Sequence, residues 1–392
     1  MGERDKITVL FVNPSAGLSG DTLSLGNLIE SLRDKIEPIV LLTEKGSPAF
    51  EYFSSLGVEC ICHPYLLLLE PPFWEKTKNV IFHLWRLRIV KWLRFELPCL
   101  LYVKKMLKDR DVDVVHSNRS QVLIGCRLAR SLGVPHVWHI REYALYGGRR
   151  IFRGLTRLKR IINNAEARIV ISNPCREWWN LKDDNTWTIN DAVRRVEDCC
   201  YVAEKLPYIL FLSHLFYDAK GARKAVEAYG RSGLFVVSHL NHVPIRMKMV
   251  GNCQEDYRRT LMALAEEYGC KGYIDFIPEQ KDVKSFFIHA MVFVNPSVNE
   301  GMGRTTAEAM FYGCPVVAHA SGGTLDLIKN GETGFLFNTV EECAEQLKKA
   351  CFSNQEEVIF RAQAFAKRFL SIEGYGERIM TVYNQVLGNN QG

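Results

Sequence analysis

The chain has 392 residues, of which 47% are hydrophobic and 24% are charged, and its formal net charge is +6. This length exceeds that of an ordinary single domain, and the composition is that of a globular protein, which excludes a disordered or fibrous chain. The mild basic excess favours phosphate-bearing partners, but no nucleic-acid-binding motif accompanies it, so we expect no nucleic acid.

The first predicted strand, Ile7–Val12, follows a charged start and is too short to be a signal peptide or a membrane span. The twelve cysteines show no CxxC pair of the metal-binding type, and they are better explained as reduced thiols. These features favour a cytoplasmic location, peripheral at the inner face of the membrane if the basic segment described below binds lipid.

Short β-branched runs alternate with helical stretches such as Ser24–Asp34 and Leu123–Ser131, which predicts parallel sheets with helices on both faces. The predicted strands of the first half are Ile7–Val12, Pro38–Leu42, Cys60–His63, Val114–His116, His136–Ile140 and Arg168–Ser172. Those of the second half are Tyr208–Ser213, Arg246–Val250, Tyr273–Ile277, Met291–Asn295 and Pro315–Ala318. We therefore expect an α/β protein with two doubly wound, Rossmann-like domains.

One segment, Phe73–Lys108, interrupts this alternation, because it interleaves Trp and Phe with Lys and Arg. This composition fits an interfacial helix that binds a membrane surface or a lipid phosphate. It fits equally well a surface helix whose basic stems cover a packed apolar stripe. Both interpretations stay open from the sequence.

The segment Asn295–Phe337 carries the densest set of candidate binding residues. A predicted strand ends at Asn295, and a glycine-containing loop with Glu300 leads into a helix that starts near Arg304. Glycines let the backbone approach a ligand closely, and a helix N-terminus offers partial positive charge, which suits a diphosphate. The carboxylate of Glu308, on that helix, can accept hydrogen bonds from a ribose, while Glu300 would meet the sugar.

The pair Glu300 and Glu308, followed by Gly313–Val317 and Gly322-Gly323, resembles the retaining GT-B glycosyltransferases of family 4. Further resembling segments are Asn13–Gly20, Asp113–His116, Gly133–His139, Ile169–Ser172, Ile189–Val193, Leu212–Gly221 and Phe369–Leu387. The resemblance thus covers nearly the whole chain, and it implies two Rossmann-like domains that face each other across a cleft. The implied parts are an acceptor-binding domain (1–194), a nucleotide-sugar-binding domain (195–371) and a helix crossing back to the first domain (372–392).

The resemblance also implies roles for single residues. The implied catalytic residues are Glu300 at the transferred sugar, Lys220 at the diphosphate, and His139 in the cleft near the reacting sugar. Arg141 and Glu142 follow His139 and either line the cleft or form an exposed ion pair. The residues implied in donor binding are Glu308 at the ribose, the loop residues Gly301, Met302 and Gly303, then Arg304, His214, and Gly17 in the first loop.

Two positions depart from the pattern of the family. His214 stands where the family has an arginine before its Lys-Gly pair, so the diphosphate would be held by fewer permanent charges unless Arg304 compensates. Asp326 stands where the family commonly has a glutamate after the Gly-Gly pair.

The implied function is transfer of a sugar from a UDP- or GDP-linked donor to an acceptor glycan, with retention of the anomeric configuration. The basic aromatic segment favours a lipid-linked acceptor, as in surface polysaccharide assembly. We expect no metal and no cofactor, because Asp111-Val112-Asp113 leads into a first-domain strand, away from the donor loop, and Lys220 with the helix dipole can replace a cation. His239 and His242 lack a carboxylate or thiolate partner and are not expected to bind a metal either.

Three alternatives remain. A nucleotide-sugar hydrolase or epimerase of the same fold would act without an acceptor. A degenerate, non-catalytic nucleotide-sugar-binding protein is suggested by His214. A nicotinamide-dependent dehydrogenase is disfavoured, because Asn13–Gly20 lacks the GxGxxG pattern after the first strand.

Overall fold

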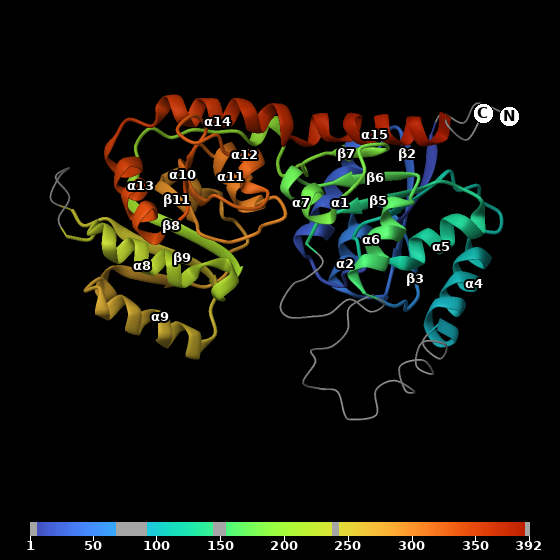
Figure 1. Ribbon diagram of the computed structural model, residues 1–392, viewed down its shortest axis with the longest axis horizontal. Coiled ribbons are helices and arrows are strands. Elements are labelled where there is room, and N and C mark those ends of the chain that lie inside the picture. Colours follow the sequence, from blue (N-terminus) through green and yellow to red (C-terminus); the bar gives the residue numbers. More distant parts are fainter. Residues whose placement is uncertain (1–5, 68–91, 144–153, 237–242, 389–392) are drawn as a thin grey trace. The chain divides into compact units, whose positions relative to one another are not determined.

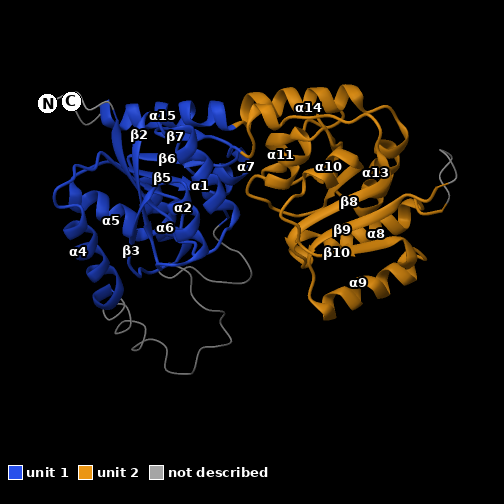
Figure 2. Ribbon diagram, turned by 180° about the vertical axis from the view of Figure 1, so that it is seen from behind, with its two compact units in different colours: residues 1–192, 372–392 blue, residues 193–371 orange. Residues whose placement is uncertain are grey.

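The computed structural model describes residues 6–67, 92–143, 154–236 and 243–388. They form two compact units, one made of Met1–Ala192 with Ile372–Gly392 and the other of Val193–Ser371 (Figure 2). The first unit is therefore discontinuous in sequence, and the boundary at Ala192 lies two residues before the position chosen from the sequence.

The first unit contains a seven-stranded sheet in which every neighbouring pair is parallel. Its strands are β1 (Ile7–Val12), β2 (Ile36–Leu42), β3 (Glu59–Cys62), β4 (Val114–Ser117), β5 (His136–Ile140), β6 (Ala167–Val170) and β7 (Thr186–Thr188), in the order β3-β2-β1-β4-β5-β6-β7. Its helices are α1 (Gly20–Ser31), α2 (Pro48–Ser55), α4 (Leu97–Met106), α5 (Leu123–Leu132), α6 (Leu155–Asn163), α7 (Asn173–Trp179) and α15 (Ile372–Gly388).

The second unit repeats this architecture with a six-stranded parallel sheet. Its strands are β8 (Leu206–Leu215), β9 (Arg246–Asn252), β10 (Ile274–Ile277), β11 (Ala290–Asn295), β12 (Val316–His319) and β13 (Phe335–Phe337), in the order β10-β9-β8-β11-β12-β13. Its helices are α8 (Ala222–Ser232), α9 (Glu255–Glu267), α10 (Lys284–His289), α11 (Arg304–Phe311), α12 (Thr324–Leu327), α13 (Val340–Phe352) and α14 (Glu356–Phe369) (Figure 1). The predicted fold class, two Rossmann-like α/β domains, is confirmed.

The core of the first unit has two layers because side chains alternate between the two faces of a strand. On β1, Val9 and Phe11 pack with α1 and α15, while Leu10 and Val12 pack on the other face with α4 and α5. All four of these side chains are fully buried, as expected of a parallel sheet covered by helices on both faces. The last helix, α15, lies beside α1 and completes the first of these layers (Figure 1).

Both sheets reverse their strand order at one point, between β1 and β4 in the first unit and between β8 and β11 in the second. In open α/β sheets the crevice outside the carboxyl ends of the strands at such a point is where ligands bind. The loops after β1, β4, β8 and β11 are therefore the candidate ligand-binding loops of the two units.

Two sequence-based predictions fall partly or wholly outside the described residues. The basic aromatic segment Phe73–Lys108 is described only from Trp92, where a short helical turn leads into α4. His239 and His242 are outside the described residues altogether. Within the described ranges, no helix combines the length and the apolar character needed to cross a membrane.

Candidate donor and acceptor sites

In the second unit, the loop after β8 meets the loop after β11 at the strand-order reversal. The Nζ of Lys220 donates to Oε1 of Glu300 at 2.6 Å, and the Oγ of Ser297 donates to the carbonyl oxygen of Ala219 at 3.2 Å. A β-carbon at Gly221 would lie 2.5 Å from the carbonyl oxygen of Pro296, so only glycine lets the two loops approach this closely. The structure thus brings together two predicted site residues, Lys220 and Glu300.

The loop that carries Glu300 rests on the Gly322-Gly323 pair. The amide of Gly323 donates to the carbonyl oxygen of Glu300 at 2.8 Å. A β-carbon at Gly323 would lie 2.2 Å from the carbonyl oxygen of Gly301, and one at Gly322 would lie 2.5 Å from that of Glu300. The two glycines therefore set the position of the whole predicted donor loop, including the buried Met302 and Gly303.

Helix α11 presents the second glutamate of the pair. It begins at Arg304, directly after Gly303, and is anchored to β11 because Nδ2 of Asn295 donates to Oγ1 of Thr306 at 2.9 Å. Glu308 lies in its second turn, and its Oε1 is 2.9 Å from Nη2 of Arg194. Arg194 was not predicted from the sequence, since nothing in its neighbourhood indicates that it reaches α11.

His214 lies at the end of β8 and is mostly exposed, with 80% of its side-chain surface accessible. Its Nδ1 pairs with Oε1 of Glu279, and the other carboxylate oxygen of Glu279 accepts a hydrogen bond of 2.7 Å from Nδ2 of Asn252. Asn252 and Glu279 lie at or just after the carboxyl ends of β9 and β10. The residue expected to face the diphosphate is thus held by a carboxylate, and neither Glu279 nor Asn252 was predicted.

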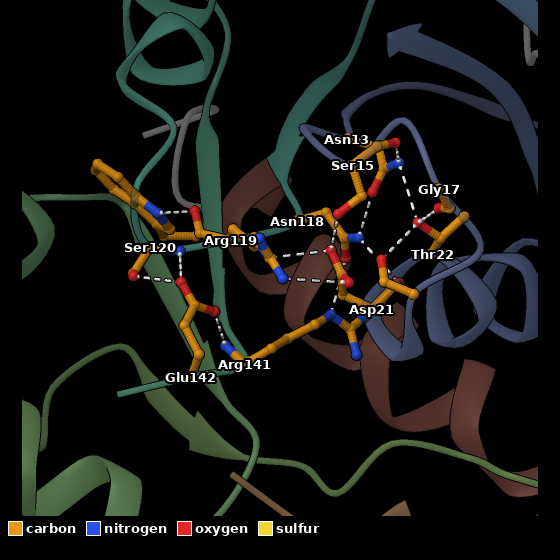
Figure 3. A network of polar contacts seen from close by, with 12 residues as sticks. Asn13, Ser15, Gly17, Asp21, Thr22, Asn118, Arg119, Ser120, Arg141 and Glu142 are labelled. Atoms are coloured by element: carbon orange, nitrogen blue, oxygen red, sulfur yellow. Dashed lines mark hydrogen bonds and ion pairs between the residues drawn. The ribbon is translucent and has the colours of Figure 1, made fainter. Parts of the chain in front are cut away.

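In the first unit, a polar network joins the loop after β1 to the loop after β4 (Figure 3). Nδ2 of Asn118 donates to Oδ1 of Asn13 at 2.9 Å, and Nε of Arg119 is 3.0 Å from Oδ2 of Asp21. Oγ1 of Thr22 donates to the carbonyl oxygen of Gly17 at 3.0 Å. A β-carbon at Gly17 would meet no atom within 4 Å, so packing inside the protein does not require glycine there.

His139 is placed differently from the expectation that it lines a cleft, because its side chain is fully buried. Its Nδ1 lies 3.2 Å from Nε2 of His116 and 3.2 Å from Nη2 of Arg141. Burial, together with the positive charge of Arg141, lowers the pKa of His139 well below its usual value, so the imidazole is neutral. The reason is that β5 is an inner strand of the sheet, and its side chains are covered on both faces.

Arg141 forms a buried ion pair with Asp191. From the sequence, Arg141 was expected either to line a cleft or to form an exposed ion pair, and the structure shows neither. Its Nε also donates to Oδ1 of Asn118 at 2.8 Å, and the hydroxyl of Tyr375 donates to Oδ1 of Asp191 at 2.9 Å. Glu142 accepts hydrogen bonds from the amide and the hydroxyl of Ser120 at 3.0 and 2.6 Å. Burial raises the pKa of Glu142, while Arg119 and Ser120 oppose this rise.

Two models of known protein families match the sequence of this chain. Residues 24–183 match the family model described as Glycosyltransferase Family 4, and residues 202–366 match the model of Glycosyl transferases group 1. Each model thus matches one of the two units, together they cover most of the chain, and the two Rossmann-like domains have the fold of GT-B glycosyltransferases. The chain belongs to this family of glycosyltransferases, with a group 1 domain as its second unit.

Among curated relatives, an uncharacterized glycosyltransferase of Haemophilus influenzae is 31% identical over 36% of this chain and 39% of its own length. A D-inositol 3-phosphate glycosyltransferase of Mycobacterium tuberculosis is 30% identical over 33% of this chain and 28% of its own length. The matches thus span well under half of these relatives. Among solved structures, HepE of Anabaena in complex with UDP has a TM-score of 0.77 at 17% identity, covering 97% of this chain and all of the other, which shows the shared fold.

Proposed function

We propose that this protein transfers a glycosyl group from a nucleoside-diphosphate sugar to an acceptor. The observation that carries the proposal is the Lys220–Glu300 pair at the strand-order reversal of the second sheet, with Glu308 on the helix that follows. An ammonium group suits a diphosphate, and carboxylates suit the hydroxyls of a sugar and a ribose. In this structure Lys220 is paired with Glu300, and Glu308 is paired with Arg194.

In this reaction, the bond between the anomeric carbon and the diphosphate breaks, and negative charge develops on the leaving nucleoside diphosphate. Lys220 and the N-terminus of α11, which begins at Arg304, would stabilise that charge. We propose that the reaction needs no metal and proceeds with retention, a donor phosphate oxygen taking the acceptor's proton on the face where the diphosphate leaves. Glu300 then orients the sugar through hydrogen bonds and forms no covalent intermediate.

Structures with the same fold support a donor class for this proposal. HepE of Anabaena has been solved with UDP and with UDP-glucose. This supports a uridine nucleotide as the donor class to be tested first, with GDP-linked sugars as the alternative.

We further propose that the acceptor is a lipid-linked glycan and that the protein works peripherally at the inner face of a membrane. The support lies on α4, which exposes the apolar side chains Leu101, Tyr102 and Met106 beside Lys104 and Lys105. Apolar side chains next to lysines are typical of helices that lie in an anionic membrane surface. The first unit, which carries α4, would then bind the acceptor.

The membrane proposal is tested by sedimentation with vesicles of phosphatidylcholine alone and with added phosphatidylglycerol. We expect the protein to sediment with the anionic vesicles, and the double variant K104E/K105E to sediment less. The matched control is K348E/K349E, which reverses two exposed, adjacent lysines on α13. Equal sedimentation of the two variants would remove the role of α4.

The transfer reaction is tested by incubating the protein with UDP- and GDP-linked sugars, with and without a lipid-linked glycan, in buffer containing EDTA. We expect an acceptor-dependent product whose anomeric configuration, read by NMR, matches that of the donor. Inversion would refute the proposed mechanism, and loss of activity in EDTA would refute metal independence. Free sugar formed without acceptor would assign hydrolysis, and nucleotide binding without any turnover would assign a non-catalytic protein.

A further inference from the structure

Arg194 is held at the start of the second unit, beside the point where that unit ends. Its backbone forms a parallel bridge with Ser371, and the amide of the preceding residue, Val193, donates to the carbonyl oxygen of Leu370 at 3.0 Å. The two chain segments through which the second unit begins and ends are thus hydrogen-bonded side by side. This fixes the backbone from which the Arg194 side chain extends.

The guanidinium group of Arg194 is fixed as well. Its Nε donates to the hydroxyl of Tyr312 at 2.6 Å, its Nη1 donates to the carbonyl oxygen of Val193 at 3.2 Å, and its Nη2 is 2.9 Å from Oε1 of Glu308. Tyr312 is only 4% exposed and directly follows α11. Because Glu308 and Tyr312 are four residues apart, they lie on the same face of the helix, and one planar group contacts both.

The ion pair between Arg194 and Glu308 is largely shielded from solvent, since 12% of the Glu308 side chain and 31% of the Arg194 side chain are accessible. The pair can therefore restrict the conformation of Glu308. A free glutamate on a helix samples several rotamers, whereas a carboxylate held by an oriented guanidinium is confined. A carboxylate has about four acceptor sites on its two oxygens, so Glu308 can accept from Arg194 and still accept from the two hydroxyls of a ribose.

We propose that Arg194 is a positioning residue that orients Glu308 for the ribose hydroxyls of the donor. The inference rests on the proposed nucleotide site and adds a residue to it. It also places ribose recognition next to the first chain segment of the second unit, because the side chain that orients Glu308 belongs to that segment.

The test measures how strongly the protein distinguishes a ribose from a ring without hydroxyls. UDP and 2′,3′-dideoxy-UDP are titrated by calorimetry into the full chain, with GDP and its dideoxy form used if GDP binds more tightly. We expect Glu308→Gln and Arg194→Gln each to lower the affinity for the ribose form by about ten-fold, the loss expected for one charged hydrogen bond. Affinity for the dideoxy form should stay unchanged, and the double variant should lose no more than either single one.

Further variants separate positioning from folding. Arg194→Lys keeps the charge but cannot make the three contacts, so the ratio of the two affinities should fall here too, by less than in Arg194→Gln. This variant decides the question if Arg194→Gln fails to fold. Arg361→Gln, which removes an exposed Arg–Glu pair on α14, is the matched control and should change neither affinity.

The outcomes separate this inference from the proposed function. If the parent protein binds neither UDP nor GDP, the proposed function fails and the inference with it. If both forms of the nucleotide bind equally, Glu308 does not contact the ribose, and the inference is overturned. If Glu308→Gln loses the preference for the ribose form while both Arg194 variants keep it, the inference alone is wrong.

Discussion

Lys220 is the residue on which the proposed chemistry depends most. Its ammonium group is 2.6 Å from Glu300 and would face the diphosphate as charge develops during bond breaking. We expect Lys220→Met to lower kcat by about 100-fold, the order of magnitude for removing one donor that stabilises a developing charge, with a smaller change in KM. Steady-state kinetics at saturating donor check this, with Lys348→Met as control. An unchanged kcat would remove Lys220 from the site.

Gly323 gives a prediction about the donor loop that does not involve any charged group. A β-carbon there would lie 2.2 Å from the carbonyl oxygen of Gly301 and 2.5 Å from Cα of Met302, so Gly323→Ala has to displace the loop. We expect a loss of roughly 1–3 kcal/mol in stability, as for other overpacked sites, and weaker nucleotide binding. Gly272→Ala is the control, since a β-carbon at Gly272 meets nothing within 4 Å. Equal nucleotide affinity in the two variants would contradict the proposed role of the glycine pair.

The sequence is informative for residues that directly follow a strand and much less so for partners from distant segments. Lys220 and Glu300 lie on loops after β8 and β11, and parallel strands bring such loops to one edge of the sheet, so their proximity was predictable. Arg194 and Glu279 reach the predicted residues through side-chain geometry that no local pattern encodes. The burial of His139 depends on His116 and Arg141 converging on it, which the strand His136–Ile140 alone does not reveal.

At the scale of elements, the strands of four or more residues are predicted and the two three-residue strands are not. All the predicted strands overlap observed ones, and β1 and β5 have the predicted bounds. β7 and β13 were missed because each has three residues, Thr186–Thr188 and Phe335–Phe337, too few to show an alternating or continuous apolar pattern. The helix after Phe369 was predicted, and the structure adds that its apolar face belongs to the core of the first unit.

The attachment of α15 to that core gives a prediction for the element. The hydroxyl of Tyr383 lies 2.7 Å from Nδ1 of His116, and both side chains are fully buried. Tyr383→Phe leaves this nitrogen without its hydrogen bond, so we expect a loss of about 1–3 kcal/mol in the free energy of unfolding. Urea denaturation followed by tryptophan fluorescence measures it. Gln385→Ala, at an exposed position of the same helix, should cost less than about 0.5 kcal/mol, and an equal loss in the two variants would contradict the assignment.

At the scale of the whole molecule, the first unit buries three neutral histidines, His116, His136 and His139. Burial lowers the pKa of His136 to about 3, while an unfolded histidine titrates near pH 6.5. Below pH 6.5 the unfolded chain therefore binds protons that the folded unit does not, so stability decreases as the pH falls. Between pH 7 and pH 5 this amounts to about 2 kcal/mol for His136.

This pH dependence can be read for the first unit alone, because all seven tryptophans lie at or before Trp187. We expect the fluorescence-detected urea midpoint to fall from pH 7 to pH 5. His136→Asn should reduce the difference in unfolding free energy between these pH values by about 2 kcal/mol. A variant with the same pH dependence as the parent would show that His136 is not the neutral, buried group described.

The discontinuity of the first unit has a consequence for its synthesis. Every strand of its sheet has been synthesised by Thr188, but Tyr375, Ile379 and Tyr383, which complete one layer of its core, follow only after all of Val193–Ser371. At translation rates of about 5–20 residues per second, the apolar face that α15 covers waits for roughly ten to forty seconds. The second unit, continuous in sequence, can fold during that interval. A nascent chain halted before Ile372 therefore carries an open apolar surface in its first half, where a chaperone would bind.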